Sequence, residues 1–267
     1  PVDPDSRVRV VSVKTVLTIA GSDPSGGAGL QSDLRTFAAF HVRGLSAVTA
    51  VTAQNNSSVK SVMAVPARLL REQIEALLEE FTIDAAKTGM IGSVENLRVI
   101  KRLMKAGRLK NLVVDTVLRS TGGKPLLDKA GAKELASLLP YAAIVTPNLP
   151  EASILTGVKI IDMTGMEKAA ETLFEMGSRT VLVKGGHLDG APTDLLYDGR
   201  AFSYFKGSRI KGPDAAFHGT GCVLSAAIAA GLAKGKSVKT AVKEAKRFLE
   251  GEIKLRVRAS ASPGPSR

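Results

Sequence analysis

The sequence contains no tryptophan, only three tyrosines and a single cysteine, Cys222. One cysteine excludes an intramolecular disulfide and favours a reducing compartment, so we expect a cytoplasmic protein. Hydrophobic residues make up 44% of the chain, yet no uninterrupted apolar run reaches the roughly 18 residues of a membrane-spanning helix. The first residues also lack the apolar core of a signal peptide. These absences predict a globular protein of 267 residues with no membrane partner.

Acidic residues are in the minority, because 37 lysines and arginines face 25 aspartates and glutamates, for a net charge of +12. Much of the excess lies between Lys234 and Arg258. A basic end can bind nucleic acid or an anionic membrane. Here the segment Val238–Leu249 has the spacing of an amphipathic helix with a solvated basic face, and no zinc-ligand or helix-turn-helix spacing occurs. We therefore expect no nucleic-acid partner.

β-Branched runs alternate with helical periodicity along the chain, which predicts an α/β fold with a mostly parallel central sheet flanked by helices. Strands are predicted at residues 15–19, 45–51, 84–88, 112–115, 143–146 and 180–184, and helices at 30–38, 66–78, 93–107, 129–139, 164–177, 223–232 and 238–249. Asp198-Gly199 is typical of a hairpin turn, so antiparallel strands are expected late in the chain. A single domain is predicted over residues 14–258, between an N-terminal extension (1–13) and a disordered tail (259–267).

A segment of small residues, His218-Gly-Thr-Gly-Cys222, directly precedes an apolar helical run that ends at Leu232. Its glycines allow the backbone to approach a ligand, and the first amides of the helix have no partners within the helix. Together with the positive end of the helix dipole, they predict an anion site, most naturally for phosphate. The alternative interpretation is a tight turn before a packed helix that buries an inert cysteine.

A second glycine-rich turn, Ala20-Gly-Ser-Asp-Pro-Ser-Gly-Gly-Ala-Gly29, joins the first predicted strand to the first predicted helix. It matches neither the dinucleotide-binding pattern nor a Walker loop. Serine, Asp23 and bare backbone suit a polar heterocycle or a sugar better than a nucleotide phosphate. The alternative is a flexible connection.

Several candidate side chains stand just after predicted strands or at the start of the next helix, and the carboxyl ends of strands line the ligand crevice in open α/β sheets. We therefore expect Asp23, Gln54, Met90, Asp115, Asn148, Glu151, Lys184 and residues 219–222 to converge. Glu151 and Asp115 could hold Mg²⁺ directly or through water. Alternatively, Glu151 is a helix-start carboxylate, Asp115 is a turn residue and Met90 is a core residue.

Six segments in order resemble the hydroxymethylpyrimidine/phosphomethylpyrimidine kinases of thiamin biosynthesis, which belong to the ribokinase-like superfamily. They are residues 18–29, 52–55, 87–90, 146–152, 183–187 and 218–222, within a match from about Val16 to about Glu252. The resemblance implies a three-layer ribokinase-like fold and, by family, a homodimer. It also implies an ATP- and Mg²⁺-dependent kinase that phosphorylates 4-amino-5-hydroxymethyl-2-methylpyrimidine and then its monophosphate.

The resemblance further implies roles for individual residues. The pyrimidine substrate would be held by Asp23, Gln54, Met90, Gly21 and Gly27. The nucleotide would lie beside Lys184, Asn148 and His218, and the metal near Glu151 and Asp115. The anion hole would be formed by Gly219, Thr220 and Gly221, with Cys222 as the catalytic base. His218 could instead only shape its loop, and His41 and His187 are expected to be structural.

We expect the helix dipole to lower the pKa of the Cys222 thiol, which would place a thiolate fraction near neutral pH. The chain departs from the family pattern at residues 116–123, after Asp115, and at Ala216-Phe217, which bears on the phosphate contacts and on the second phosphorylation. A pyridoxal kinase of the same superfamily remains an alternative function. So does a phosphate-binding regulatory protein without catalysis.

Overall fold

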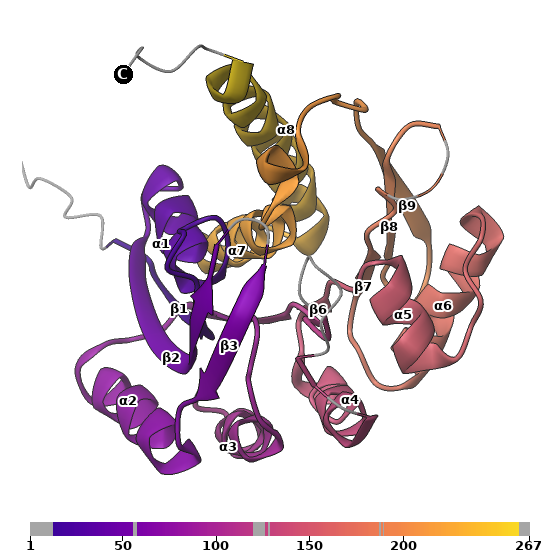
Figure 1. Cartoon of the computed structure of the whole chain (residues 1–267). Coiled ribbons are helices and arrows are strands. Elements are labelled where there is room, and N and C mark those ends of the chain that lie inside the picture. The colour runs from indigo at the N-terminus through magenta and orange to yellow at the C-terminus, as the bar shows by residue number, and fades with distance from the viewer. Residues whose placement is uncertain are drawn as a thin grey trace, which may run out of the picture.

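In the computed structural model, which describes residues 13–55, 58–119, 126, 127, 129–186, 188 and 190–261, a nine-stranded sheet is covered by helices on both faces (Figure 1). The strand order is β3-β2-β1-β4-β5-β6-β7-β8-β9. The strands are β1 (Thr15–Ser22), β2 (Arg43–Gln54), β3 (Val59–Ala64), β4 (Ala85–Thr88), β5 (Leu112–Val114), β6 (Ile144–Val145), β7 (Val181–Val183), β8 (Thr193–Tyr197) and β9 (Phe202–Lys206). The six strands from β2 to β7 in this order are parallel, while β3, β8 and β9 run antiparallel to their neighbours.

The helices form one layer on each face of the sheet, and each layer has its own apolar core. One layer contains α1 (Gly29–Ala39), the short 3-10 helix η2 (Asp214–Phe217), α7 (Thr220–Ala233) and α8 (Val238–Ala261). The other contains α2 (Ala67–Glu80), α3 (Val94–Lys105), α4 (Lys129–Ala136), the short 3-10 helix η1 (Leu139–Tyr141), α5 (Leu149–Thr156) and α6 (Met163–Glu175). Alternate residues of one strand serve both cores: Val113 packs under α7, whereas Leu112 and Val114 face the other layer.

The predicted three-layer architecture and the late antiparallel hairpin are confirmed. One antiparallel pairing was not expected, because β3 folds back on β2 near the start of the chain. The long β2 also includes Gln54, which lies beyond the strand predicted at residues 45–51. Pairing of Gln54 with Val59 across the hairpin keeps the backbone extended there.

Several helix ends differ from the predicted ranges, and two of them are informative. The helix predicted from Thr164 begins at Met163, after Asp162, whose carboxylate accepts a 2.8 Å hydrogen bond from the Gly165 amide. A carboxylate caps the orphan amides at this helix start, so the threonine is not needed there. Helix α8 continues to Ala261, past the predicted start of the tail at Ala259. Residues 262–267 and 1–12 lie outside the described residues.

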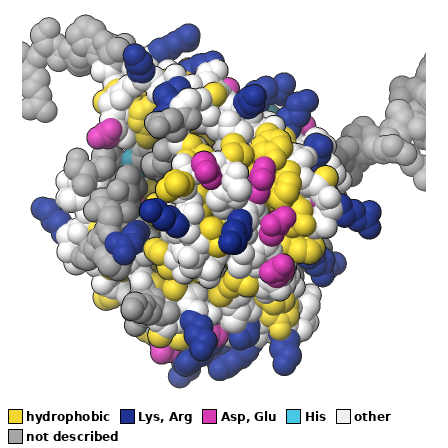
Figure 2. Space-filling view, turned by 90° about the vertical axis from the view of Figure 1, so that its right-hand side faces the viewer, with side chains coloured by type: hydrophobic (Ala, Val, Ile, Leu, Met, Phe, Trp, Pro, Cys, Tyr) yellow, Lys and Arg dark blue, Asp and Glu magenta, His cyan; other side chains and the backbone are white. Residues whose placement is uncertain are grey.

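The segment Asp214–Ala233, which contains η2 and α7, is long and apolar enough to cross a membrane by composition. In this fold, however, 67% of its most apolar window is buried, because α7 packs against α1, α8 and the sheet. It is therefore a core helix. On the face seen in Figure 2, lysine and arginine side chains are spread among acidic, hydrophobic and other side chains.

Candidate active site

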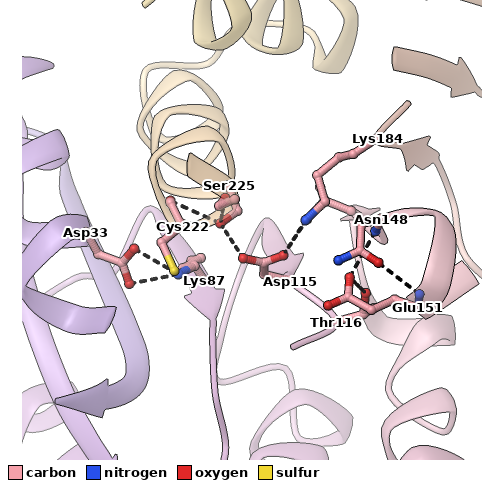
Figure 3. A network of polar contacts seen from close by, with 11 residues as sticks. Asp33, Lys87, Asp115, Thr116, Asn148, Glu151, Lys184, Cys222 and Ser225 are labelled. Atoms are coloured by element: carbon pink, nitrogen blue, oxygen red, sulfur yellow. Dashed lines mark hydrogen bonds and ion pairs between the residues drawn. The ribbon is translucent and has the colours of Figure 1, made fainter. Parts of the chain in front are cut away.

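The start of α7 lies at the carboxyl edge of the parallel strands, where the predicted anion loop meets polar side chains from β4 and from the segments after β5 and β7 (Figure 3). Gly219, the N-cap residue, has a φ of +73°, which favours glycine. The first amides of α7 are not bonded within the helix. The geometry therefore supplies the backbone donors that the sequence predicted for an anion.

The anion loop touches the N-terminal glycine-rich loop. A Cβ added to Gly219 would lie only 2.1 Å from the carbonyl oxygen of Gly27, so a side chain cannot be accommodated at position 219. A Cβ on Gly29 would likewise lie 2.5 Å from the carbonyl oxygen of Gly21. The two glycine-rich segments, almost 200 residues apart in the sequence, are thus in contact through their backbones.

Asp23 links these two loops. Its Oδ1 accepts hydrogen bonds from the amide and hydroxyl of Ser25, and its Oδ2 accepts from the Ala28 amide at 2.8 Å and contacts Nε2 of His218 at 3.1 Å. Burial raises the pKa of Asp23, but these hydrogen bonds outweigh burial and hold it below its ordinary value. In this structure both Asp23 and His218 shape the loops.

Lys184 lies on the other side of the anion loop. Its Nζ donates to Oδ1 of Asp115 at 3.0 Å and would lie 3.3 Å from a Cβ at Gly221. Asp115 also accepts from Thr146 on Oδ1 and from Ser225 on Oδ2. Burial opposes ionisation of both groups, but their mutual attraction is stronger. The pKa of Asp115 is therefore lowered, chiefly by Lys184, and that of Lys184 is raised, chiefly by Asp115. A charged ammonium therefore stands beside the predicted phosphate position.

Asn148 and Glu151 form a capping box at the start of α5. The Asn148 Oδ1 accepts from the Glu151 amide, and the Glu151 Oε2 accepts in return from the Asn148 amide, both at 2.9 Å. The Oε2 also accepts from Thr116. Burial raises the pKa of Glu151, and the nearby Asp115 charge adds to that effect against the opposing Lys184.

The two acidic residues differ in what they offer a metal ion. Among the described residues, the hydrogen bonds accepted by Glu151 go to Oε2, which leaves Oε1 for a cation or its waters. Both oxygens of Asp115 are engaged by Lys184, Thr146 and Ser225. No group of three or more potential metal ligands occurs in the described part of the chain. This fits Mg²⁺ bound mainly by phosphate oxygens and water with Glu151 at its edge.

Cys222 lies in the first turn of α7 and is partly exposed. Burial raises the pKa of its thiol to about 11, and this effect exceeds the opposing charge of Lys87 and the hydrogen bond from the Gly29 amide. The predicted thiolate fraction near neutral pH is therefore wrong in this structure, because burial outweighs the effects that favour the thiolate. The thiol is largely desolvated and lies near the carboxylates of Asp33 and Asp115, which disfavour a thiolate.

The remaining predicted substrate residues lie at the ends of β1, β2 and β4. Gly21 leaves room for Met90, whose Cε would lie 2.3 Å from a Cβ at position 21. The Met90 carbonyl accepts from Thr49. Gln54 lies on the part of β2 that extends beyond β1, since Ser22 at the end of β1 pairs with Val51.

Sequence reasoning missed Lys87, Asp33, Thr116 and Ser225 as site residues. Lys87 belongs to one of the segments that carry the family resemblance, and Asp33 is a charge on the predicted apolar face of a helix; both were available signals. His41 has a φ of +50° just after α1, in keeping with a structural role. His187 and residues 120–123 of the divergent segment lie outside the described residues.

Two solved structures resemble the whole arrangement. A phosphomethylpyrimidine kinase of Clostridium difficile matches with a TM-score of 0.80 and 39% identity over 90% of this chain and 99% of that one. A pyridoxal kinase of Staphylococcus aureus in complex with AMP-PCP matches with a TM-score of 0.84 and 38% identity over 91% and 89%. The fold and the site thus define a phosphotransferase of the ribokinase-like class.

The sequence comparisons specify the family within this class. The model of the phosphomethylpyrimidine kinase family matches residues 23–267. The hydroxymethylpyrimidine/phosphomethylpyrimidine kinase of Haemophilus influenzae is 40% identical over 262 residues, which cover 96% of each chain. The chain therefore belongs to the phosphomethylpyrimidine kinase family.

Proposed function

We propose that this chain uses ATP to phosphorylate the hydroxymethyl group of 4-amino-5-hydroxymethyl-2-methylpyrimidine and then phosphorylates the monophosphate to the diphosphate, in thiamin biosynthesis. Family membership supports the substrate class. The observation that carries the reaction type is the position of Cys222 and Lys184 next to Gly221: Cys222 follows it in the first turn of α7, and Nζ of Lys184 would lie 3.3 Å from a Cβ at Gly221. Phosphoryl transfer to a hydroxyl group requires a proton acceptor, hydrogen-bond donors that hold the phosphate and a fixed cation.

In the first step the substrate hydroxyl oxygen bonds to the γ-phosphorus of ATP as the bond to the leaving ADP oxygen breaks. The thiol of Cys222 first loses its proton to solvent, and the hydroxyl proton then passes to Sγ of the thiolate. The amides from Gly219 to Gly221 hold the transferred phosphoryl oxygens, and Lys184 balances their charge. Mg²⁺ at Glu151 would neutralise charge on the ATP phosphates when bound.

The second step differs in its nucleophile. The attacking atom is an oxygen of the monophosphate, which is largely ionised near neutral pH because the second pKa of such a phosphate is about 6. No hydroxyl proton has to be removed. Cys222 therefore assists the first phosphorylation more than the second.

The substrate assignment is tested by measuring ADP release with the pyrimidine, its monophosphate and pyridoxal as separate acceptors. We expect turnover with the first two and a higher kcat/KM for the pyrimidine than for pyridoxal. Turnover of the pyrimidine without the monophosphate would limit the function to the first step. If no ADP is released with any of the three acceptors, the proposal is contradicted and a phosphate-binding protein without catalysis is favoured.

Pyridoxal kinase is the second candidate function, because the similarity to the Staphylococcus aureus pyridoxal kinase is as high as that to the Clostridium difficile enzyme. Pyridoxal is also a flat heterocycle with a hydroxymethyl group. A higher kcat/KM for pyridoxal in the same assay would favour it. We further propose a homodimer in the cytoplasm, which light scattering of the purified protein and cell fractionation would test.

A further inference from the structure

A fully buried ion pair lies below the anion loop. Lys87, next to the carboxyl end of β4, places Nζ 2.8 Å from each carboxylate oxygen of Asp33 in α1, and both side chains are completely inaccessible to solvent. Thr18 of β1 donates to Oδ2 of Asp33 at 2.6 Å. The carboxylate that holds the lysine ammonium is thus itself held by β1.

Stability alone does not account for this pair. Removing two charges from water costs several kcal/mol per ion, and well-packed apolar residues commonly replace a buried pair without loss of stability. The pair lies next to the reactive end of α7: in Figure 3 the Cys222 sulfur points toward Lys87 and Asp33. Lys87 and Cys222 also act electrostatically on each other.

The charged groups that act on this thiol come from five surrounding parts of the fold. They are Lys87 in β4, Asp33 in α1, Asp115 after β5, Lys184 after β7 and Arg256 in α8. Of the three cations, Lys184 is bound to Asp115 and faces the proposed phosphate position. Arg256, in α8, donates a hydrogen bond to the His218 carbonyl. Lys87 alone among them has a side chain that is completely inaccessible to solvent.

We propose that Lys87 is a positioning residue for the reaction, whose ammonium, held by Asp33, stabilises the negative charge that Cys222 needs to act as a base. This inference rests on the proposed function of the thiol. The thiol first releases its proton to solvent; the thiolate then takes the hydroxyl proton as the new oxygen–phosphorus bond forms and ADP leaves. Lys87 keeps its own proton throughout, because Asp33 raises the pKa of the ammonium against the effect of burial.

The test uses alkylation of the full-length protein without ligands by iodoacetamide, followed by intact mass. Cys222 is the only cysteine, so every label reports this thiol. Labelling rates from about pH 7 to about pH 11 report the thiolate fraction, because only the thiolate reacts, and a higher midpoint appears as a lower rate at each pH. Each unit of pKa change alters the thiolate fraction about tenfold below the midpoint.

Lys87→Met should slow labelling about tenfold or more at each pH from about 7 to about 10. Lys246→Met is the matched control, since Lys246 forms a similar buried pair with Asp194 but does not act on the thiol. Its labelling midpoint should equal that of the unmodified protein.

Equal midpoints for a folded Lys87→Met variant and the unmodified protein would overturn the inference. If Lys87→Met does not fold, Lys87→Gln takes its place, because it is uncharged but can still donate a hydrogen bond to Asp33. Slower labelling of a folded Lys87→Gln variant supports the role of Lys87, and equal labelling overturns it. Labelling needs no turnover, so the result stands apart from the kinase assay. In that assay, a folded Lys87→Met variant should lose more kcat in the first phosphorylation than in the second.

Discussion

Nζ of Lys184 lies 3.0 Å from Oδ1 of Asp115, and these residues follow two strands, β7 and β5, that are separated in the sheet by β6. The ion pair spans the carboxyl edge of the sheet beside the start of α7. Asp115 is further held by Ser225 of α7, so strand ends and helix are fixed together. The cation that would meet a phosphate is therefore positioned before any ligand binds, which reduces the reorganisation needed in the transition state.

Replacement of the proposed base should separate the two phosphorylations. Cys222→Ala should lower kcat for the pyrimidine about 10²-fold, the lower end of general-base effects, because proton transfer is late in a loose transition state. The monophosphate should lose much less. Cys222→Asp should retain part of the first activity, since an aspartate can also accept the proton. Rates of ADP release with each acceptor, under conditions where chemistry limits turnover, check this; an unchanged first step would leave Cys222 a packing residue.

Gln54 should affect the heterocycle and not the nucleotide. Gln54→Ala removes a polar contact from the end of β2, and a substrate group left unpaired in a buried site costs about 1–3 kcal/mol. We therefore expect a lower kcat/KM for the pyrimidine with nearly unchanged KM for ATP. Steady-state kinetics with each substrate varied in turn measure both values. A variant with unaltered kcat/KM would show that Gln54 does not contact the substrate.

Gly219 and Gly235 form a matched pair for testing the loop contact. Both have positive φ, +73° and +76°, so alanine at either position should cost about 1–2 kcal/mol of stability. Only Gly219 is crowded: its added Cβ would meet the Gly27 carbonyl, whereas nothing lies within 4 Å at Gly235. Gly219→Ala should lower the melting temperature further and reduce kcat strongly, while Gly235→Ala should keep its kcat. Equal losses of activity would argue against a loop contact at the site.

The Asp23 carboxylate should make stability depend on pH in a defined direction. Its pKa in the folded state lies below the ordinary value of 3.8, so it contributes stability above that pH and loses it as the pH falls through the folded-state pKa. Urea unfolding of the unmodified protein and of Asp23→Asn should show a stability difference that is largest near about pH 7 and smaller near about pH 3. A difference that grows as the pH falls would contradict this assignment.

Much of the fold could be predicted from local patterns in the sequence. The β-branched runs at β1 and β5 and the helical spacing of α3, with its Ser93 cap, are properties of neighbouring residues, so they are visible without tertiary structure. The exact ends of the helices were harder to predict from the sequence. Asp162 and not Thr164 caps α6, because either residue type can cap and the geometry selects one. The antiparallel strand β3 could not be predicted from local patterns, because its direction is set by its pairing with β2, which is a contact between strands.

The sequence by itself determined the residue types and their placement after strands: the anion loop, Cys222, Lys184 and Glu151 were all accessible as candidates because parallel strands share a carboxyl edge. Only the tertiary structure decided their electrostatics. The pKa of Cys222 depends on burial and on Lys87, Asp33 and Asp115, which reach it from distant parts of the chain. The same holds for Asp23, which contacts His218 across 195 residues. Charge interactions depend on distance and solvent exposure in three dimensions, and a linear sequence carries neither.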